Sequence, residues 1–409
     1  MSKPLDITLL CNVVDNYGDI GFVYRLSRSL LEVNKNLSLR LVVNDLHSFA
    51  FMAPGLDESK AVQCFEGIKV LDWNKSELCR ADFTEFPASV ILQCFQCERP
   101  SWLEEILFKS SDWKNEQKAK TLILNVEYLT AETWAEEFHL LPSATRSAAV
   151  KKINFMPGFT AKTGGLVLDE NFMKCRSDRT FALSVLPKKL SAQLQACFEN
   201  SLSVLVFAYP RDFTPLIQAL NLASKSMNIH VFCASPQFSA ACSHSDISFD
   251  ISNLEPLSQK EWDALLCLCD FLFVRGEDSF SRACLSGKPF VWSAYVQENS
   301  FHLVKVSALL DLMSCHFAEP HMQLISQAML SYNRDNVLHE SSEVGDVLSH
   351  YACIGSYEKS APLLSQMLLQ CTKLSDGFSS FAKSLVSNGN LAEKLLDFIS
   401  EWKLKNYSA

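Results

Sequence analysis

Short apolar runs that alternate with amphipathic helical stretches are the feature that most constrains how this chain can fold. The alternation runs from about residue 7 to residue 138 and starts again near residue 203. Apolar runs of about four to eight residues are typical of strands buried on both faces, and strands separated by helices form parallel sheets. The sequence therefore predicts an α/β protein with two Rossmann-like domains.

The expected elements follow from this pattern. In the first half, strands are predicted at 7–14, 39–43, 68–71, 90–94 and 121–126, and helices at 21–31, 100–108 and 131–138. In the second half, strands are predicted at 203–207, 229–233, 271–274 and 289–292, and helices at 213–224, 259–267, 279–285 and 301–310. We expect domains at 1–185 and 186–375, with C-terminal helices at 376–409 that pack back on the first domain. Two such domains facing one another would enclose a cleft, and ligands bind outside the carboxyl ends of such strands.

Composition excludes several classes of protein. The formal net charge is −9 over 409 residues, and a nucleic-acid partner would require clustered lysine and arginine. No apolar stretch reaches the roughly 18–20 residues that span a bilayer, and the first residues lack the layout of a signal peptide. We therefore expect a cytoplasmic protein that binds neither nucleic acid nor membrane.

The 15 cysteines are scattered through apolar runs. Cys94 and Cys97 form a lone CxxC, and Cys267 and Cys269 flank one residue. Structural zinc usually needs a second pair of ligands at regular spacing, which the sequence lacks. Buried, reduced thiols are the favoured interpretation, in preference to a metal or redox site.

Several familiar motifs are absent. The chain has no GxGxxG, no GxxxxGK[ST], no HExxH and no GxSxG, which disfavours ordinary NAD dehydrogenases, P-loop kinases, zinc proteases and serine hydrolases. Asp-x-Asp, which many nucleotide-sugar enzymes use to hold a metal on the diphosphate, is also missing. Its absence favours a metal-independent site, in which arginine, hydroxyl groups and a helix N-terminus neutralise the phosphates.

The first polar constellation is the turn after the first strand, Asp15-Asn-Tyr-Gly-Asp-Ile-Gly21. Its two glycines suggest a tight turn that a ligand approaches closely. Asp15 and Asp19 lie four residues apart and can both face the cleft. The alternative is structural, with Asp19 as the N-cap of the following helix and Asp15 shaping the turn.

The second constellation is Arg275-Gly-Glu-Asp-Ser279, between a strand and a helix. Gly276 permits close backbone approach, and the helix-start amides with Arg275 and Ser279 suit a diphosphate. Glu277 or Asp278 can accept hydrogen bonds from sugar or ribose hydroxyls. The alternative is an acidic first turn that merely complements the helix dipole.

Other polar and aromatic side chains fall near this turn. Gln259 and Trp262 open the preceding helix, and Tyr209 follows the strand that ends at Phe207. Aromatic residues at such positions can stack on a nucleobase, although core packing is their usual role. Two more candidates for the donor are Gln297 and Glu298.

These motifs resemble the bacterial protein-arginine rhamnosyltransferase family that modifies translation elongation factor P. The family's Asp-Asn-aromatic-Gly-Asp-Ile-Gly signature matches Asp15–Gly21, and its Arg-Gly-Glu-Asp-Ser-Phe signature matches Arg275–Phe280. Further matches are Asn125–Leu129, Pro157–Thr160, Thr163–Gly165 and Gly287–Trp292. The resemblance spans about residues 5–310, and the motifs occur in the family's order.

The resemblance implies a two-domain B-type (GT-B) glycosyltransferase. Such an enzyme moves L-rhamnose from TDP-β-L-rhamnose to one arginine of elongation factor P, with inversion and without metal or other cofactor. The first domain would bind the acceptor protein, and the second would bind the donor. By match to the motifs, the catalytic residues would be Asp19, Asp15 and Glu277. The donor-binding residues would be Tyr209, Gln259, Trp262, Arg275, Gly276, Asp278 and Ser279.

Two alternatives stay open at this point. Another GT-B glycosyltransferase, or a nucleotide-sugar epimerase, would share the fold and act on a lipid, a glycan or a free sugar. A non-catalytic protein that binds a translation factor would also fit the fold. The presence of the four carboxylates Asp15, Asp19, Glu277 and Asp278 disfavours this last alternative.

Overall fold

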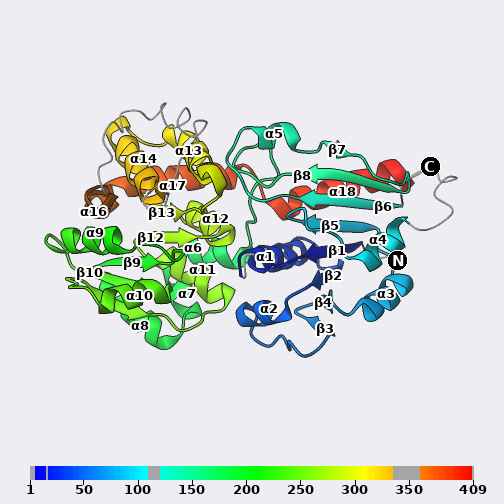
Figure 1. The fold of residues 1–409 in the computed structure, drawn as a ribbon, viewed down its shortest axis with the longest axis horizontal. Helices are drawn as coiled ribbons and strands as arrows, with labels where there is room; N and C mark the ends of the chain where they lie inside the picture. The colour runs from blue at the N-terminus through cyan, green and yellow to red at the C-terminus, as the bar shows by residue number, and fades with distance from the viewer. Residues whose placement is uncertain (1–4, 15–16, 109–119, 335–359, 408–409) are drawn as a thin grey trace. The chain divides into compact units, whose positions relative to one another are not determined.

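The computed structural model describes residues 5–14, 17–108, 120–334 and 360–407. The chain divides into two compact units, residues 1–170 with 386–409 and residues 171–385. Each unit has its own β-sheet flanked by helices (Figure 1). The predicted α/β class with two Rossmann-like domains is confirmed.

The unit boundaries differ from the expected ones at 185 and 376. Helix α7 (Arg179–Val185) belongs to the second unit, where it packs on α11 (Gln259–Leu268). Helix α17 (Cys371–Ser387) also falls mostly in the second unit, whereas α18 (Leu391–Tyr407) packs on α1 (Tyr17–Val33) of the first. Each of these helices belongs to the unit whose apolar surface it covers. Its position along the sequence does not show which unit that is.

The first unit contains an eight-stranded sheet in the order β3-β4-β2-β1-β5-β6-β8-β7. The parallel strands are β1 (Asp6–Cys11), β2 (Ser38–Val43), β4 (Ile68–Asp72), β5 (Val90–Cys94), β6 (Thr121–Val126) and β8 (Val150–Phe155). The antiparallel edge strands are β3 (Val62–Phe65) and β7 (Pro142–Ser143). The parallel strands alone follow the doubly wound order, which reverses direction between β1 and β5.

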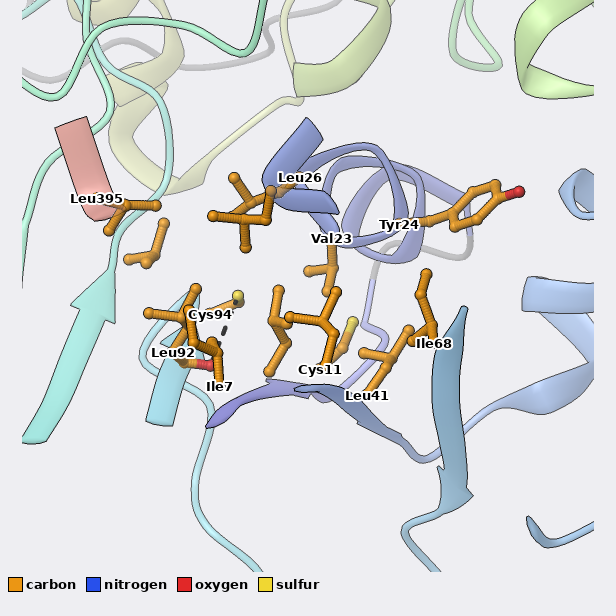
Figure 2. Packing of buried hydrophobic residues seen from close by; sticks show 14 of the residues in the cluster. Ile7, Cys11, Val23, Tyr24, Leu26, Leu41, Ile68, Leu92, Cys94 and Leu395 are labelled. Atoms are coloured by element: carbon orange, nitrogen blue, oxygen red, sulfur yellow. Dashed lines mark hydrogen bonds between the residues drawn. The ribbon is translucent and has the colours of Figure 1, made fainter. Parts of the chain in front are cut away.

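Helices cover both faces of this sheet. On one face, α1 and α18 pack over β1, β2 and β5, with Val23, Leu26 and Leu395 meeting Ile7 and Leu92 (Figure 2). On the other face lie α3 (Ser76–Glu85) and α4 (Ser101–Phe108), which contribute Phe83 and Trp102. Because β1 is buried on both sides, its sequence is mostly apolar, and this pattern predicted the strand.

The remaining helices of the first unit are α2 (Leu46–Met52) and α5 (Trp134–Phe138). The helices α2 and α3 and the strands β3, β7 and β8 were not predicted. Strand β8 contains two adjacent lysines, and β3 is a four-residue edge strand with alternating exposure, so neither has the apolar run of a central strand.

The second unit contains a five-stranded parallel sheet in the order β11-β10-β9-β12-β13. Its strands are β9 (Leu202–Val206), β10 (Ile229–Cys233), β11 (Asp250–Asn253), β12 (Phe271–Arg275) and β13 (Phe290–Ser293). Its other helices are α6 (Glu170–Ser177, from the unit boundary), α8 (Lys188–Cys197), α9 (Thr214–Ser224), α10 (Pro236–Ser243), α12 (Glu277–Ser286), α13 (Phe301–Ser314), α14 (Glu319–Arg334) and α16 (Ser360–Leu369). The strand order reverses between β9 and β12, and ligands of such sheets bind at this point.

In the part of the chain that the structure describes, no helix is both long and apolar enough to cross a membrane.

The pH dependence of the first unit can be tested at His139. Burial lowers the pKa of His139 to about 4, and its Nδ1 atom accepts a hydrogen bond from the Met156 N–H at 3.1 Å. An unfolded histidine has a pKa of about 6.5, so between pH 6.5 and 4 the unfolded chain binds a proton that the folded chain does not. The free energy of unfolding therefore decreases as the pH falls through this window. Because the ring is partly exposed, we expect a loss of about 1 kcal/mol between pH 7 and 5. His139→Gln, which keeps an acceptor, should show less loss in denaturant unfolding; equal losses would contradict the assignment.

Candidate functional site

The second unit carries its candidate site where the strand order reverses. Strand β9 is followed by Phe207 and Tyr209, and the neighbouring strand β12 ends at Arg275. The backbone N–H of Phe207 donates to the carbonyl of Phe273 on β12 at 2.8 Å, which continues the pairing beyond β9. The sheet therefore places these three side chains at one edge.

Gly276 makes the turn from β12 into α12. Its φ of 68° and ψ of 169° lie in a region that is almost restricted to glycine. The helix consequently begins at Glu277, two residues before the predicted start at Ser279. Glu277, Asp278 and Ser279 form its first turn, where backbone N–H groups and the helix dipole favour an anion.

Arg275 lies between two aromatic rings. Its guanidinium carbon is 4.6 Å from the ring centre of Phe207 and 4.6 Å from that of Tyr209. Among the described residues, no hydrogen-bond partner reaches its buried Nε atom. A half-buried guanidinium that two rings hold beside a helix start suits a phosphate ligand.

The start of α11 braces the first turn of α12. The Trp262 indole N–H donates to the Ser279 hydroxyl at 3.0 Å, and its ring packs edge-on against Phe207 with centroids 5.0 Å apart. The Gln259 side-chain amide donates to an Asp278 oxygen at 3.4 Å. The structure thus brings together the seven residues, Tyr209, Gln259, Trp262, Arg275, Gly276, Asp278 and Ser279, that the resemblance assigned to donor binding.

One neighbour of this site was missed by the sequence analysis. Tyr295 follows β13, is 65 % exposed and packs edge-on against Tyr209 with ring centroids 5.5 Å apart. The Asn333 side chain fixes this loop by accepting from the Ala294 N–H at 2.9 Å, and His302 accepts from the Gln297 N–H at 3.4 Å. An aromatic residue directly after a parallel strand was the available signal.

Of the two further donor candidates, Gln297 is half-buried in the loop after β13, and the Glu298 side chain lies outside the described residues.

The first unit carries Asp19 where its own strand order reverses. Helix α1 begins at Tyr17, earlier than the predicted Gly21, so Asp19 lies inside the first helical turn. Its side chain is buried, with one oxygen accepting from the Val14 N–H at 2.8 Å and the other from the Tyr128 hydroxyl at 3.4 Å. Asp19 is therefore not an N-cap: it holds the loop between β1 and α1. Asp15 lies outside the described residues.

Two stacked aromatic pairs lie at the start of α1 and at the carboxyl edge of the sheet, and one of them includes Tyr128, which contacts Asp19. Tyr17 stacks on Phe51 of α2 with ring centroids 4.6 Å apart, and Tyr128 stacks on Phe95 with centroids 4.3 Å apart. Phe95 follows β5 and Tyr128 follows β6, so both belong to the carboxyl edge that also holds Asp19. Aromatic faces next to a carboxylate suit a guanidinium, which stacks as well as donating hydrogen bonds.

Glu127 is a further carboxylate at this edge to which the sequence analysis assigned no role. Burial raises its pKa, although the side-chain amides of Gln96 and Asn125 both donate to it and oppose that shift. Gln96 adopts a positive φ of 50°. An ionisable residue directly after a buried strand was the signal that could have identified it.

The described cysteines are all free thiols, and all are buried except Cys64 and Cys315. Burial raises the pKa of Cys97 to about 11 and raises that of Cys94 further. Thiols of this kind are poor nucleophiles, in agreement with the interpretation of buried, reduced cysteines.

Solved structures with the same fold define the class of the protein. The chain matches the structure that describes EarP-mediated arginine glycosylation of translation elongation factor EF-P, with a TM-score of 0.51 and 20% identity over 97% of this chain and 99% of that one. It also matches spinosyn rhamnosyltransferase SpnG, with a TM-score of 0.50 and 9% identity over 97% and 100% of the two chains. Both matches support the two-domain GT-B fold.

Sequence comparison shows the family. The model described as "Elongation-Factor P (EF-P) rhamnosyltransferase EarP" matches residues 7–400. A protein-arginine rhamnosyltransferase from Shewanella oneidensis is 32% identical over 74% of this chain and 80% of its own length. One from Pseudomonas putida is 33% identical over 76% and 82%. The chain belongs to the EF-P rhamnosyltransferase EarP family and is a glycosyltransferase.

Proposed function

We propose that this enzyme transfers L-rhamnose from TDP-β-L-rhamnose to one arginine of translation elongation factor P, with inversion at the anomeric carbon, and so activates that factor. Family membership supports the acceptor and the sugar. The observation that carries the donor assignment is the Arg275 guanidinium, which is held against the Phe207 and Tyr209 rings beside the start of α12.

The donor is proposed to bind in the second unit. Its diphosphate would take hydrogen bonds from Arg275, Ser279 and the first amides of α12. Asp278 would accept from a hydroxyl of the donor, and Tyr209 with Tyr295 offers aromatic surface to the base. Because these groups are fixed by stacking and hydrogen bonds, they are preorganised for the charge that develops on the leaving diphosphate.

The acceptor guanidinium is proposed to bind next to Asp19. An arginine side chain has a pKa above about 12 and, when protonated, has no lone pair with which to attack carbon. A carboxylate must therefore take a proton as the C–N bond forms, and a second one must hold the planar group in place. We assign proton removal to Asp19, orientation of the guanidinium to Asp15, and a third essential carboxylate role to Glu277.

The proposed transfer forms one bond at the anomeric carbon and breaks one. A guanidinium nitrogen forms a bond to the anomeric carbon while the bond from that carbon to the diphosphate oxygen breaks. The proton leaves the nitrogen for the carboxylate, and the electron pair of the broken bond leaves with TDP. Attack opposite the leaving group inverts the anomeric configuration.

A mass measurement tests the proposal. Incubation of the chain with elongation factor P and TDP-β-L-rhamnose, with EDTA present, should add one deoxyhexose to a single arginine of the factor. A parallel series with Mg²⁺ should give equal rates, because arginine, serine and a helix start replace the metal at the diphosphate. No mass shift would contradict the function, and activity that EDTA abolishes and Mg²⁺ restores would contradict the metal-independent site.

A further inference from the structure

An exposed apolar surface on α5 and the residues after it has no role in the proposed chemistry. We define the α5 surface as Trp134, Phe138, Leu140 and Leu141, which are 41 %, 47 %, 42 % and 46 % exposed. Large apolar side chains at this exposure are ordinary when scattered, but here four fall within eight residues, and two of them, Trp134 and Phe138, are in contact. Such patches mark sites of interaction with another macromolecule.

The α5 surface is held firmly by the sheet beneath it. Trp134 and Phe138 are four residues apart on α5 and pack edge-to-face with ring centroids 5.6 Å apart. The Leu140 N–H donates to the Asn154 carbonyl at 2.8 Å, and the Asn154 N–H donates to the Leu141 carbonyl at 2.9 Å. Leu140 adopts a φ of 64°, a costly conformation for leucine that persists only where the surroundings enforce it.

The charged side chains within residues 127–141 are all acidic. Residues 127–141 include four glutamates, Glu127, Glu132, Glu136 and Glu137, and no lysine or arginine. Lys162 pairs with Glu136 at 2.9 Å and Lys152 lies near Glu127, so Glu132 and Glu137 contribute most of the negative field. The surface is therefore complementary to a partner that presents apolar side chains together with arginine or lysine.

The α5 surface lies at the same sheet edge as Asp19. Helix α5 follows the carboxyl end of β6, and Leu140 and Leu141 pair with the last residues of β8. Strand β8 is three strands from β1 in the sheet. Three spacings of about 4.8 Å place the two features roughly 14 Å apart along the edge, a distance that one protein face covers.

We propose that the α5 surface docks the acceptor protein, contacting apolar and basic residues that flank its target arginine. This inference rests on the proposed function, which makes an arginine-bearing protein the acceptor. A tryptophan and a phenylalanine rimmed by polar groups are typical of the residues that carry the binding energy of protein interfaces. A second copy of the chain fits poorly, because a two-fold contact would set these glutamates against themselves.

The test uses the full-length enzyme with Trp134→Ala/Phe138→Ala and, separately, Glu137→Lys. The matched control is Phe86→Ala, a phenylalanine of the same unit that is 51 % exposed after α3. We expect the dissociation constant and the KM for elongation factor P to rise on the order of 10–100-fold in the double variant. The kcat at saturating acceptor, the donor affinity and the melting temperature should stay near those of the wild type, as in the control.

Each other outcome decides against one of the two ideas. Unchanged acceptor binding in both variants overturns the docking surface. A wild-type dimer that the variants dissociate, without any change in acceptor KM, also overturns it and assigns the surface to a second copy. Wild-type enzyme that binds the factor through these residues but never modifies it overturns the proposed function and leaves the docking surface in place.

Discussion

Replacing Asp19 with asparagine should leave a folded protein that binds TDP-rhamnose and turns over roughly 10²–10⁴-fold more slowly. The structural contact survives this change, because an asparagine carbonyl can accept the Val14 N–H that the Asp19 carboxylate now accepts at 2.8 Å. The substitution removes the negative charge and, with it, the capacity to take a proton from the guanidinium. Steady-state kinetics, donor binding by calorimetry and thermal unfolding together measure the effect.

Tyr128→Phe is the matched control for this experiment. It removes the hydroxyl that lies 3.4 Å from Asp19 and keeps the ring that stacks on Phe95. A contact of that length contributes little, so we expect turnover to fall only a few-fold. If Asp19→Asn turned over at nearly the normal rate, the role of base would pass to Asp15 or Glu277, and Glu277→Gln would be the next variant.

Replacing Asp278 with asparagine should weaken the binding of TDP-rhamnose by about 10–100-fold. A hydrogen bond to a charged group contributes roughly 1.5–3 kcal/mol, which corresponds to that range of affinity. Asp278 is 9 % exposed in the first turn of α12, where the Gln259 amide already holds it in place. Calorimetric titration with TDP-rhamnose measures the loss, and TDP alone shows how much of it depends on the sugar.

Ser286→Ala supplies the control, because Ser286 is the last residue of the same helix and its hydroxyl donates to the Ala283 carbonyl at 2.8 Å. The structural alternative gives a different result. If Asp278 only complemented the helix dipole, its substitution would lower the melting temperature and leave donor affinity intact. Tighter binding of TDP by the variant would also remove Asp278 from the donor site.

The class of fold could be predicted because the central strands have a recognisable apolar sequence pattern. Strands such as β9 and β12 are buried on both faces, so their sequences are almost entirely apolar. Strands β8 and β11 could not be predicted in the same way. The first carries two lysines, and the second, with the sequence DISN, forms a sheet edge, so their place depends on pairing with neighbours rather than on their own side chains.

The exact residues at which helices begin were also not predicted correctly from the sequence. The predicted starts at Gly21 and Ser279 were late by four and two residues, since α1 begins at Tyr17 and α12 at Glu277. At α12 the reason is the backbone of Gly276, whose positive φ turns the chain directly from strand to helix. The consequence at α1 is functional: Asp19 becomes a helical residue that supports the preceding loop.

By itself, the sequence determined which residue types stand at the carboxyl ends of the strands, because apolar runs and turn residues are local signals. It thereby identified the Arg275–Ser279 turn and the Asp15–Gly21 turn. Tertiary structure decided which distant residues meet there. Asp19 reaches Tyr128 across 109 positions, and Arg275 lies between Phe207 and Tyr209, because strand order and register place those loops side by side. Such pairings depend on the packing of whole sheets, a long-range property that no local pattern contains.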